Sequence, residues 1–373
     1  GEYTADIYGS NKHFLGSKTH TVSANATELI WKENEDQILY GTGLGSEDRF
    51  GSSVRISGNY AIVGALYEDE AVSDAGAAYI FYKSGGTWTQ QAILTASDAA
   101  NNDQFGNYVD IDGDYAIVGA YNENSNTGAA YIFKRSGTSW TQQTKLTASN
   151  AGSSDEFGRA VGISGDYAFV GARREDTGGT DRGSAYIFVR SGTTWTQQAQ
   201  LQPSDTADSD HFGRSVSISG NILVVGSNTA DPGGISNAGS AYIFERSGTN
   251  WVEIKKITAS DAQASDEFGV GVATDGTTIF VGAGGEDTKG SGAGAAYIFS
   301  KGAKAKPSLT FDGYNKLTAP VLEASFTATR LSDWDNNNQS KTEQSGVGDW
   351  PDSTTGMTHW WTLHNNDKCY TNS

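Results

Sequence analysis

Residues 103–133 read DQFGNYVDIDGDYAIVGAYNENSNTGAAYIF, and close variants of this stretch occur five times in the chain. Each copy has a Phe-Gly pair, an apolar alternation, a tight turn, Val-Gly-Ala or Val-Gly-Ser, a polar loop and Tyr-Ile-Phe. The pairs begin at Phe50, Phe105, Phe157, Phe212 and Phe268, so the period is 52 to 56 residues. A fixed period in this range, with about four short strands per unit, predicts a β-propeller.

The second copy shows how one repeat is expected to fold. Residues 107–111 alternate and predict a first strand, and Gly113-Asp114 predicts a two-residue hairpin turn. The apolar run 115–120 predicts a central strand buried on both faces. Residues 129–133 predict a third strand, and the polar alternation of 140–146 predicts a fourth strand at the solvent edge. Each repeat therefore supplies one four-stranded antiparallel blade.

The two ends of the chain lack this regularity, and they decide the expected number of blades. We take 1–373 as a single propeller, with five regular repeats over 50–319 and residues 309–319 as the fourth strand of the fifth repeat. Residues 1–49 and the Trp-rich residues 320–373 are interpreted as degenerate blades. Dividing the 373 residues by seven gives about one period. We therefore expect seven blades; the alternative is six, with a composite closing blade.

The composition and charge of the chain limit the partners and the cellular location that we expect. The net charge of −18 disfavours nucleic acid as a partner, because phosphates would be repelled. No stretch approaches the ~20 apolar residues of a membrane span. Cys369 stands alone, so no internal disulfide is expected. Asn25 and Asn338 each begin an N-glycosylation triplet outside the regular repeats. The acidic charge suits a secreted, extracellular or cell-surface protein, whereas the near-absence of cysteine says little about the compartment.

The Phe-Gly, Val-Gly-Ala and Tyr-Ile-Phe pattern resembles FG-GAP repeats, which build the N-terminal propeller of integrin alpha chains. The resemblance covers residues 48–319 in five copies in register. It implies a propeller with an extracellular adhesion or ligand-binding role, and it names no partner.

The chain departs from integrin-type repeats at the calcium loop between the first two strands. Most copies have only a two-residue turn there, such as Ser164-Gly165-Asp166, which cannot supply six to eight oxygens. Asp110, Asp112 and Asp114 alone retain three carboxylates. Calcium at these residues is one interpretation, and a solvated acidic hairpin is the favoured one; no other cofactor is expected.

Acidic residues recur in the loops that follow the second strand, on the face from which the fourth-to-first connections also emerge. They form the candidate ligand-binding face for an extracellular protein or polysaccharide. The residues are Glu68, Asp69, Glu123, Glu175, Asp176, Asp231, Glu286 and Asp287. The Asp two positions before each Phe is expected instead to bind nearby backbone N–H groups.

The tryptophans divide into two groups. Those of the fourth strands, at Trp88, Trp140, Trp195 and Trp251, fit packing between blades better than carbohydrate stacking. Trp350, Trp360 and Trp361 lie outside the repeats and are a candidate contact surface for self-assembly or neighbouring domains.

Catalytic motifs are missing from the sequence. The five histidines form no metal-spacing motif, and acids repeated at equivalent positions indicate structure, whereas an enzyme needs one asymmetric site. We expect a non-enzymatic adhesion or recognition propeller. The alternatives are a structural module of a larger secreted assembly that contacts neighbours through its irregular ends and, remotely, a polysaccharide-active enzyme.

Overall fold

A computed structural model describes residues 2–8, 14–21, 35–69, 72–302, 360–364 and 368–372. The chain divides into two compact units, residues 1–301 and 302–373. In the first unit, β1 (Glu2–Tyr8) and β2 (Phe14–Thr21) form an antiparallel pair. In the second, β22 (Trp360–His364) and β23 (Lys368–Asn372) form another. No helix among the described residues has the length and apolar character to cross a membrane.

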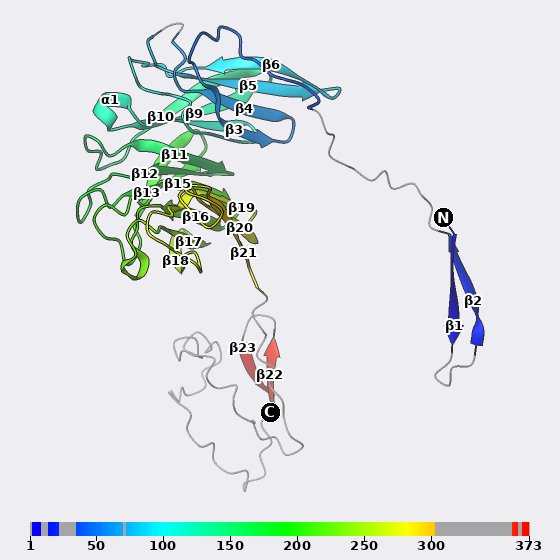
Figure 1. Cartoon of the computed structure of the whole chain (residues 1–373). Coiled ribbons are helices and arrows are strands. Elements are labelled where there is room, and N and C mark those ends of the chain that lie inside the picture. The colour runs from blue at the N-terminus through cyan, green and yellow to red at the C-terminus, as the bar shows by residue number, and fades with distance from the viewer. Residues whose placement is uncertain are drawn as a thin grey trace. The chain divides into compact units, whose positions relative to one another are not determined.

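Five antiparallel sheets follow one another along residues 50–300 (Figure 1). The first sheet contains β3 (Phe50–Ser57), β4 (Tyr60–Ala65), β5 (Ala77–Ser84) and β6 (Thr87–Leu94). The second contains β7 (Val109–Asp112), β8 (Tyr115–Ala120), β9 (Ala129–Ser136) and β10 (Ser139–Leu146), with the one-turn α1 (Glu123–Asn126) between β8 and β9. The third contains β11 (Phe157–Ser164), β12 (Tyr167–Ala172), β13 (Ser184–Ser191) and β14 (Thr194–Leu201).

The fourth sheet contains β15 (Ser215–Ser219), β16 (Ile222–Ser227), β17 (Ser240–Ser247) and β18 (Asn250–Ile257), with a short 3₁₀ turn at Pro232–Gly234. The described part of the fifth contains β19 (Phe268–Thr274), β20 (Thr278–Ala283) and β21 (Ala295–Ser300). The first strand of each later sheet packs against the first two strands of the sheet before it. The described residues therefore form a five-bladed β-propeller of antiparallel blades, four of which show all four strands.

The expectation of seven blades is wrong, and so is the alternative of six. The division of the chain length by the period assumed that every residue belongs to a blade. The blades are instead formed by the residues that carry the repeat, and neither 1–49 nor 320–373 contains a Phe-Gly pair; the sheets described in these two ranges have only two strands each. Residues 309–319, Asn25, Asn338 and Trp350 lie outside the described residues. Trp360 and Trp361 belong to β22, of which only the backbone is described.

The repeated aromatic residues hold the blades together. Each Phe of a Phe-Gly pair from the second repeat to the fifth is buried and meets a Tyr ring edge-on, as Phe157 does with Tyr186 at 5.3 Å. The Trp195 indole N–H donates to Gln143 Oε1 of the preceding blade at 2.9 Å, and Trp140 makes the same bond to Gln91 at 3.1 Å. The interpretation of the fourth-strand tryptophans as packing residues is thus confirmed for Trp140 and Trp195.

Glycine in the Val-Gly-Ala motif allows neighbouring blades to approach backbone to backbone. A Cβ added at Gly171 would lie 2.0 Å from the carbonyl oxygen of Gly213 in the next repeat. The same close approach relates Gly119 to Gly158. A larger side chain would therefore push two blades apart, which explains the glycine without reference to ligand binding.

Candidate functional site

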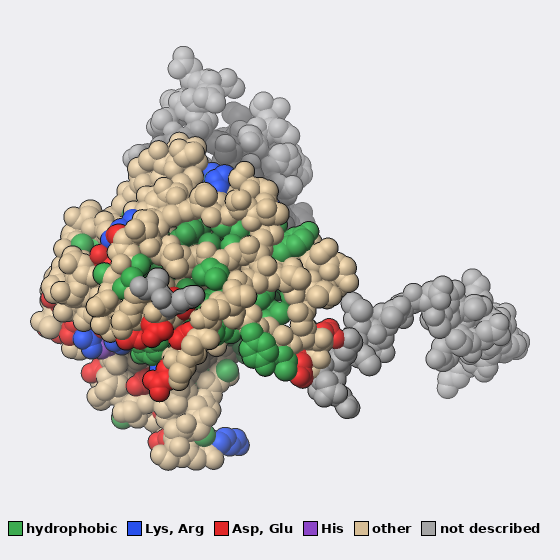
Figure 2. Space-filling model, turned by 90° about the horizontal axis from the view of Figure 1, so that it is seen from above, with side chains coloured by type: hydrophobic (Ala, Val, Ile, Leu, Met, Phe, Trp, Pro, Cys, Tyr) green, Lys and Arg blue, Asp and Glu red, His purple; other side chains and the backbone are tan. Residues whose placement is uncertain are grey.

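The loops after the second strands and the connections that precede each Phe-Gly pair emerge on one face of the propeller, here called the loop face. Isolated bridges join the two kinds of segment, as between Gly183 and Phe212. Acidic side chains gather in several patches in the view of Figure 2, and basic side chains lie next to some of them. Seven of the eight acidic candidates divide into two groups on this face, and Glu123 belongs to neither.

Three of the glutamates are buried and organise their own loops: Glu68, Glu175 and Glu286. Glu175 Oε1 accepts hydrogen bonds from Asn150 Nδ2 at 2.7 Å and from the backbone N–H of Thr177 at 3.0 Å. Its Oε2 accepts from Ser184 Oγ at 2.7 Å. Glu286 Oε1 likewise accepts from the N–H of Thr288. These carboxylates are therefore part of the loop scaffold, and their positions are unsuited to contact with a large ligand.

The aspartates of the same loops are exposed instead: Asp69, Asp176, Asp231 and Asp287, here called the acidic rim. One oxygen of Asp176 accepts from the N–H of Asp181 at 2.8 Å, and one of Asp231 accepts from Asn237 at 2.7 Å. Asp287 binds the N–H of Gly292 in the same way at 2.5 Å. A single backbone bond thus fixes each of these three side chains while its other oxygen stays available. Glu123 is half-buried and pairs with Lys145 at 2.9 Å.

The aspartates two positions before each Phe behave as the sequence predicts. Each accepts a hydrogen bond, at 2.7 or 2.8 Å, from the backbone N–H three residues before it. The five residues are Asp48, Asp103, Asp155, Asp210 and Asp266. Burial raises the pKa of Asp103, Asp155 and Asp210, and the backbone bond opposes that rise. Their turn-forming role is confirmed.

The three calcium candidates are each held by a protein group. Asp110 accepts from the N–H of Ile163 at 2.8 Å, and Asp112 accepts from the N–H of Gly165 at 2.8 Å. Asp114 pairs with Arg135. Within the described residues, no three His, Cys, Asp or Glu side chains gather closely enough to hold a metal ion. Asp110 and Asp112 therefore join the second blade to the third, a role that Ser217 performs for Thr274 at 3.1 Å.

Sequence reasoning missed a group of arginines at the inner edge of the loop face. Glu156 pairs with Arg159 at 3.6 Å, Arg173 at 2.6 Å and Arg174 at 3.3 Å. Arg214 of the fourth repeat donates to the Tyr108 hydroxyl of the second at 3.2 Å, so it reaches across the intervening blade. We call Arg159, Arg173, Arg174 and Arg214 the axial arginine cluster. The signal that could have found it is the irregularity of these positions between copies.

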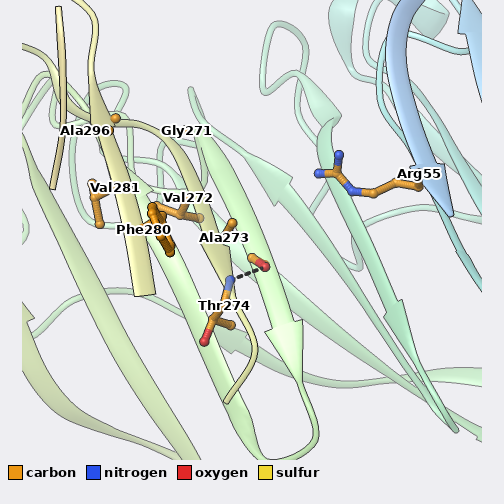
Figure 3. A pocket seen from close by; sticks show the side chains of 10 residues that line it. Arg55, Gly271, Val272, Ala273, Thr274, Phe280, Val281 and Ala296 are labelled. Atoms are coloured by element: carbon orange, nitrogen blue, oxygen red, sulfur yellow. Dashed lines mark hydrogen bonds between the residues drawn. The ribbon is translucent and has the colours of Figure 1, made fainter. Parts of the chain in front are cut away.

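An open cavity of about 370 Å³ is lined by residues of β3, β15, β19, β20 and β21 (Figure 3). Arg55 extends from β3 on one side, and Val272, Ala273, Thr274 and Phe280 lie on the other. A guanidinium is thus the one charged group among the residues that line it. Arg55 lies 3.9 Å from Asp110, so this cation is partly balanced.

The comparison with known families agrees with this architecture. The FG-GAP repeat model matches residues 34–81, 88–133, 140–188, 195–244 and 251–299, which together make up more than half of the chain. Each match after the first runs from one fourth strand through the first three strands of the next sheet, and the first match covers 34–49 and the first three strands of the first sheet. The chain therefore belongs to the FG-GAP repeat family. No curated protein matches it.

Proposed function

We propose that the chain is a non-enzymatic recognition module that acts outside the cell and binds a protein or polysaccharide partner through its loop face. The observation that supports this most directly is the acidic rim. Asp69, Asp176, Asp231 and Asp287 occupy equivalent loop positions on four blades, are exposed, and in three cases are fixed by a backbone hydrogen bond. A preorganised ring of like charge favours encounter with a partner of opposite charge.

The scaffold and the loops contribute differently to such a role. The strands repeat nearly residue for residue, whereas the loops after the second strands differ in sequence on every blade. Variable loops on a rigid scaffold are the usual arrangement for binding surfaces. The repeated scaffold alone is equally compatible with a structural module of a larger assembly. Contacts of such a module through Trp350, Trp360 and Trp361 stay a prediction.

The test is binding of the full chain to arrays of extracellular proteins and glycans. A variant with Asp69, Asp176, Asp231 and Asp287 changed to Asn should lose at least tenfold in affinity for the partner found. The matched control changes Asp114, Asp166 and Asp275, which lie in the hairpin turns between first and second strands, to Asn. Equal binding by both variants would contradict a role for the rim, and the lack of any partner would contradict recognition.

A further inference from the structure

The residue directly after each Phe-Gly pair breaks the repeat. The five copies carry Ser52, Asn107, Arg159, Arg214 and Val270 at this position. Arg159 and Arg214 are therefore absent from the equivalent place in the other three blades, so the repeated scaffold does not require them. Positions that differ between otherwise equal repeats are where a ring of blades can build one asymmetric site.

The surroundings of Arg159 leave a hydrogen-bond donor of its side chain without an acceptor. Its side chain is only 18% exposed, and its Nε is buried. This Nε has no hydrogen-bond acceptor among the described residues; the guanidinium instead faces Glu156 at 3.6 Å and the Tyr121 ring at 4.8 Å. The Nε of Arg190 is also buried without an acceptor, but its two terminal nitrogens donate to Asp166 and to the carbonyl of Gly192. The terminal nitrogens of Arg159 make no such bond to the described residues. Buried donors without acceptors are costly, so an acceptor is expected to come from outside.

Positive charge around Arg159 is incompletely balanced. Glu156 serves Arg159, Arg173 and Arg174 at once, and Arg173 binds it with two hydrogen bonds of 2.6 and 3.1 Å. Arg214 adds a further cation whose hydrogen bond goes to a neutral hydroxyl. Burial, followed by repulsion from Arg214 and Arg173, lowers the pKa of Arg159. This excess of cations is notable in a chain of net charge −18.

A further donor lies in the same region. The Tyr108 hydroxyl accepts from Arg214 and can donate its own proton. A guanidinium presents a planar fork of N–H groups that matches carboxylate and sulfate oxygens.

We propose that Arg159 and Arg214, with the Tyr108 hydroxyl, form a binding site for one oxyanion group, a carboxylate or a sulfate, at the inner edge of the loop face. The site uses different residues from the acidic rim and stands independently of the function proposed for the rim. Because the surrounding rim repels free anions, the site best suits an anionic group that is attached to a neutral or basic ligand.

The test is thermal unfolding of the full chain in 0 to 20 mM sodium sulfate and, separately, sodium acetate, with sodium chloride keeping the ionic strength constant. An ion that binds only the folded protein raises the midpoint, and above its Kd the rise grows with the logarithm of the ion concentration; we expect about 2–4 °C at 20 mM. Arg159→Gln and Arg214→Gln should each abolish the rise. Arg190→Gln, which removes an arginine from the opposite side of the blades, should retain it.

The two salts distinguish the ligand chemistry, because a rise with only one of them identifies that group as the bound anion. Sulfate can also stabilise proteins without binding to a site, but that effect would persist in both Gln variants. The proposal is overturned if neither salt raises the midpoint, or if the rise survives in Arg159→Gln. Should a Gln variant fold poorly, Arg159→Lys keeps the charge without the fork and should weaken binding about tenfold.

Discussion

The third and fifth sheets have nearly the same strand sequences but different surroundings. Phe169 on β12 and Ile187 on β13 are fully buried between two neighbouring blades. Their equivalents on the fifth sheet, Phe280 on β20 and Ile298 on β21, are 47% and 61% exposed with respect to the described residues. The repeat therefore specifies a strand with an apolar face, while burial of that face depends on the next blade.

The first sheet shows the same effect on its opposite face. Val54 and Ile56 of β3 are 55% and 65% exposed, whereas Val161 and Ile163 at the same positions of β11 are buried. Both terminal blades thus carry one face with the composition of a packing surface. The interior blades, packed on both sides, are expected to be the most resistant to unfolding.

The largest predicted effect tests whether this difference in burial changes the contribution of the side chain to the free energy of unfolding. Phe169→Ala removes a fully buried ring and should lower the free energy of unfolding by about 3–5 kcal/mol. Phe280→Ala, the matched change on the fifth sheet, should cost less than about 1 kcal/mol if its ring is half-exposed in solution. Chemical denaturation of the full-length variants measures both. A cost at Phe280 equal to that at Phe169 would show that the outer face of the fifth sheet is covered in the intact chain.

The second prediction concerns a hydrogen bond between the second and third sheets whose acceptor is a carboxylate. Asp110 accepts from Ile163, while the equivalent bond between the fourth and fifth sheets uses the neutral Ser217. Burial raises the pKa of Asp110 from 3.8 to about 6, opposed by the N–H of Ile163 and by Arg55. The folded state therefore binds the proton more tightly than the unfolded state, so stability falls as pH rises from about 4 to 6.

The free energy of unfolding is expected to fall over this pH range by at most about 3 kcal/mol, because each unit of pKa difference contributes about 1.36 kcal/mol. Asp110→Asn should remove this part of the pH dependence in denaturation curves measured between pH 4 and 7. Asp112→Asn, which removes a carboxylate with a similar bond to Gly165, provides the control. A pH profile unchanged by Asp110→Asn would show that this carboxyl is better solvated than its surroundings indicate.

The sequence predicted the blades well and the site less well, for physical reasons that particular residues make clear. Alternation and turn glycines are local signals, so the strands of a blade follow directly from residues such as those of 107–120. The blade number depends on whether the ends pack as blades, and no local pattern reports that. The acidic positions were found, but the burial of Glu175 depends on Asn150 and Ser184, which belong to other segments. Arg159 was not predicted because the candidate residues were chosen for their recurrence between repeats, and Arg159 interrupts the repeat.

The smallest of the three effects tests the close approach of neighbouring backbones. Gly171→Ala would place a Cβ 2.0 Å from the carbonyl oxygen of Gly213, so the third and fourth blades must separate slightly. Overpacking of this kind should cost about 1–3 kcal/mol. At Gly282, the same position of the fifth sheet, an added Cβ would meet Val270 at 3.7 Å, an ordinary contact. Gly282→Ala should therefore be close to neutral in the same denaturation assay. A substantial cost at Gly282 would indicate, together with a large effect of Phe280→Ala, that another part of the chain packs on the fifth sheet as the fourth packs on the third.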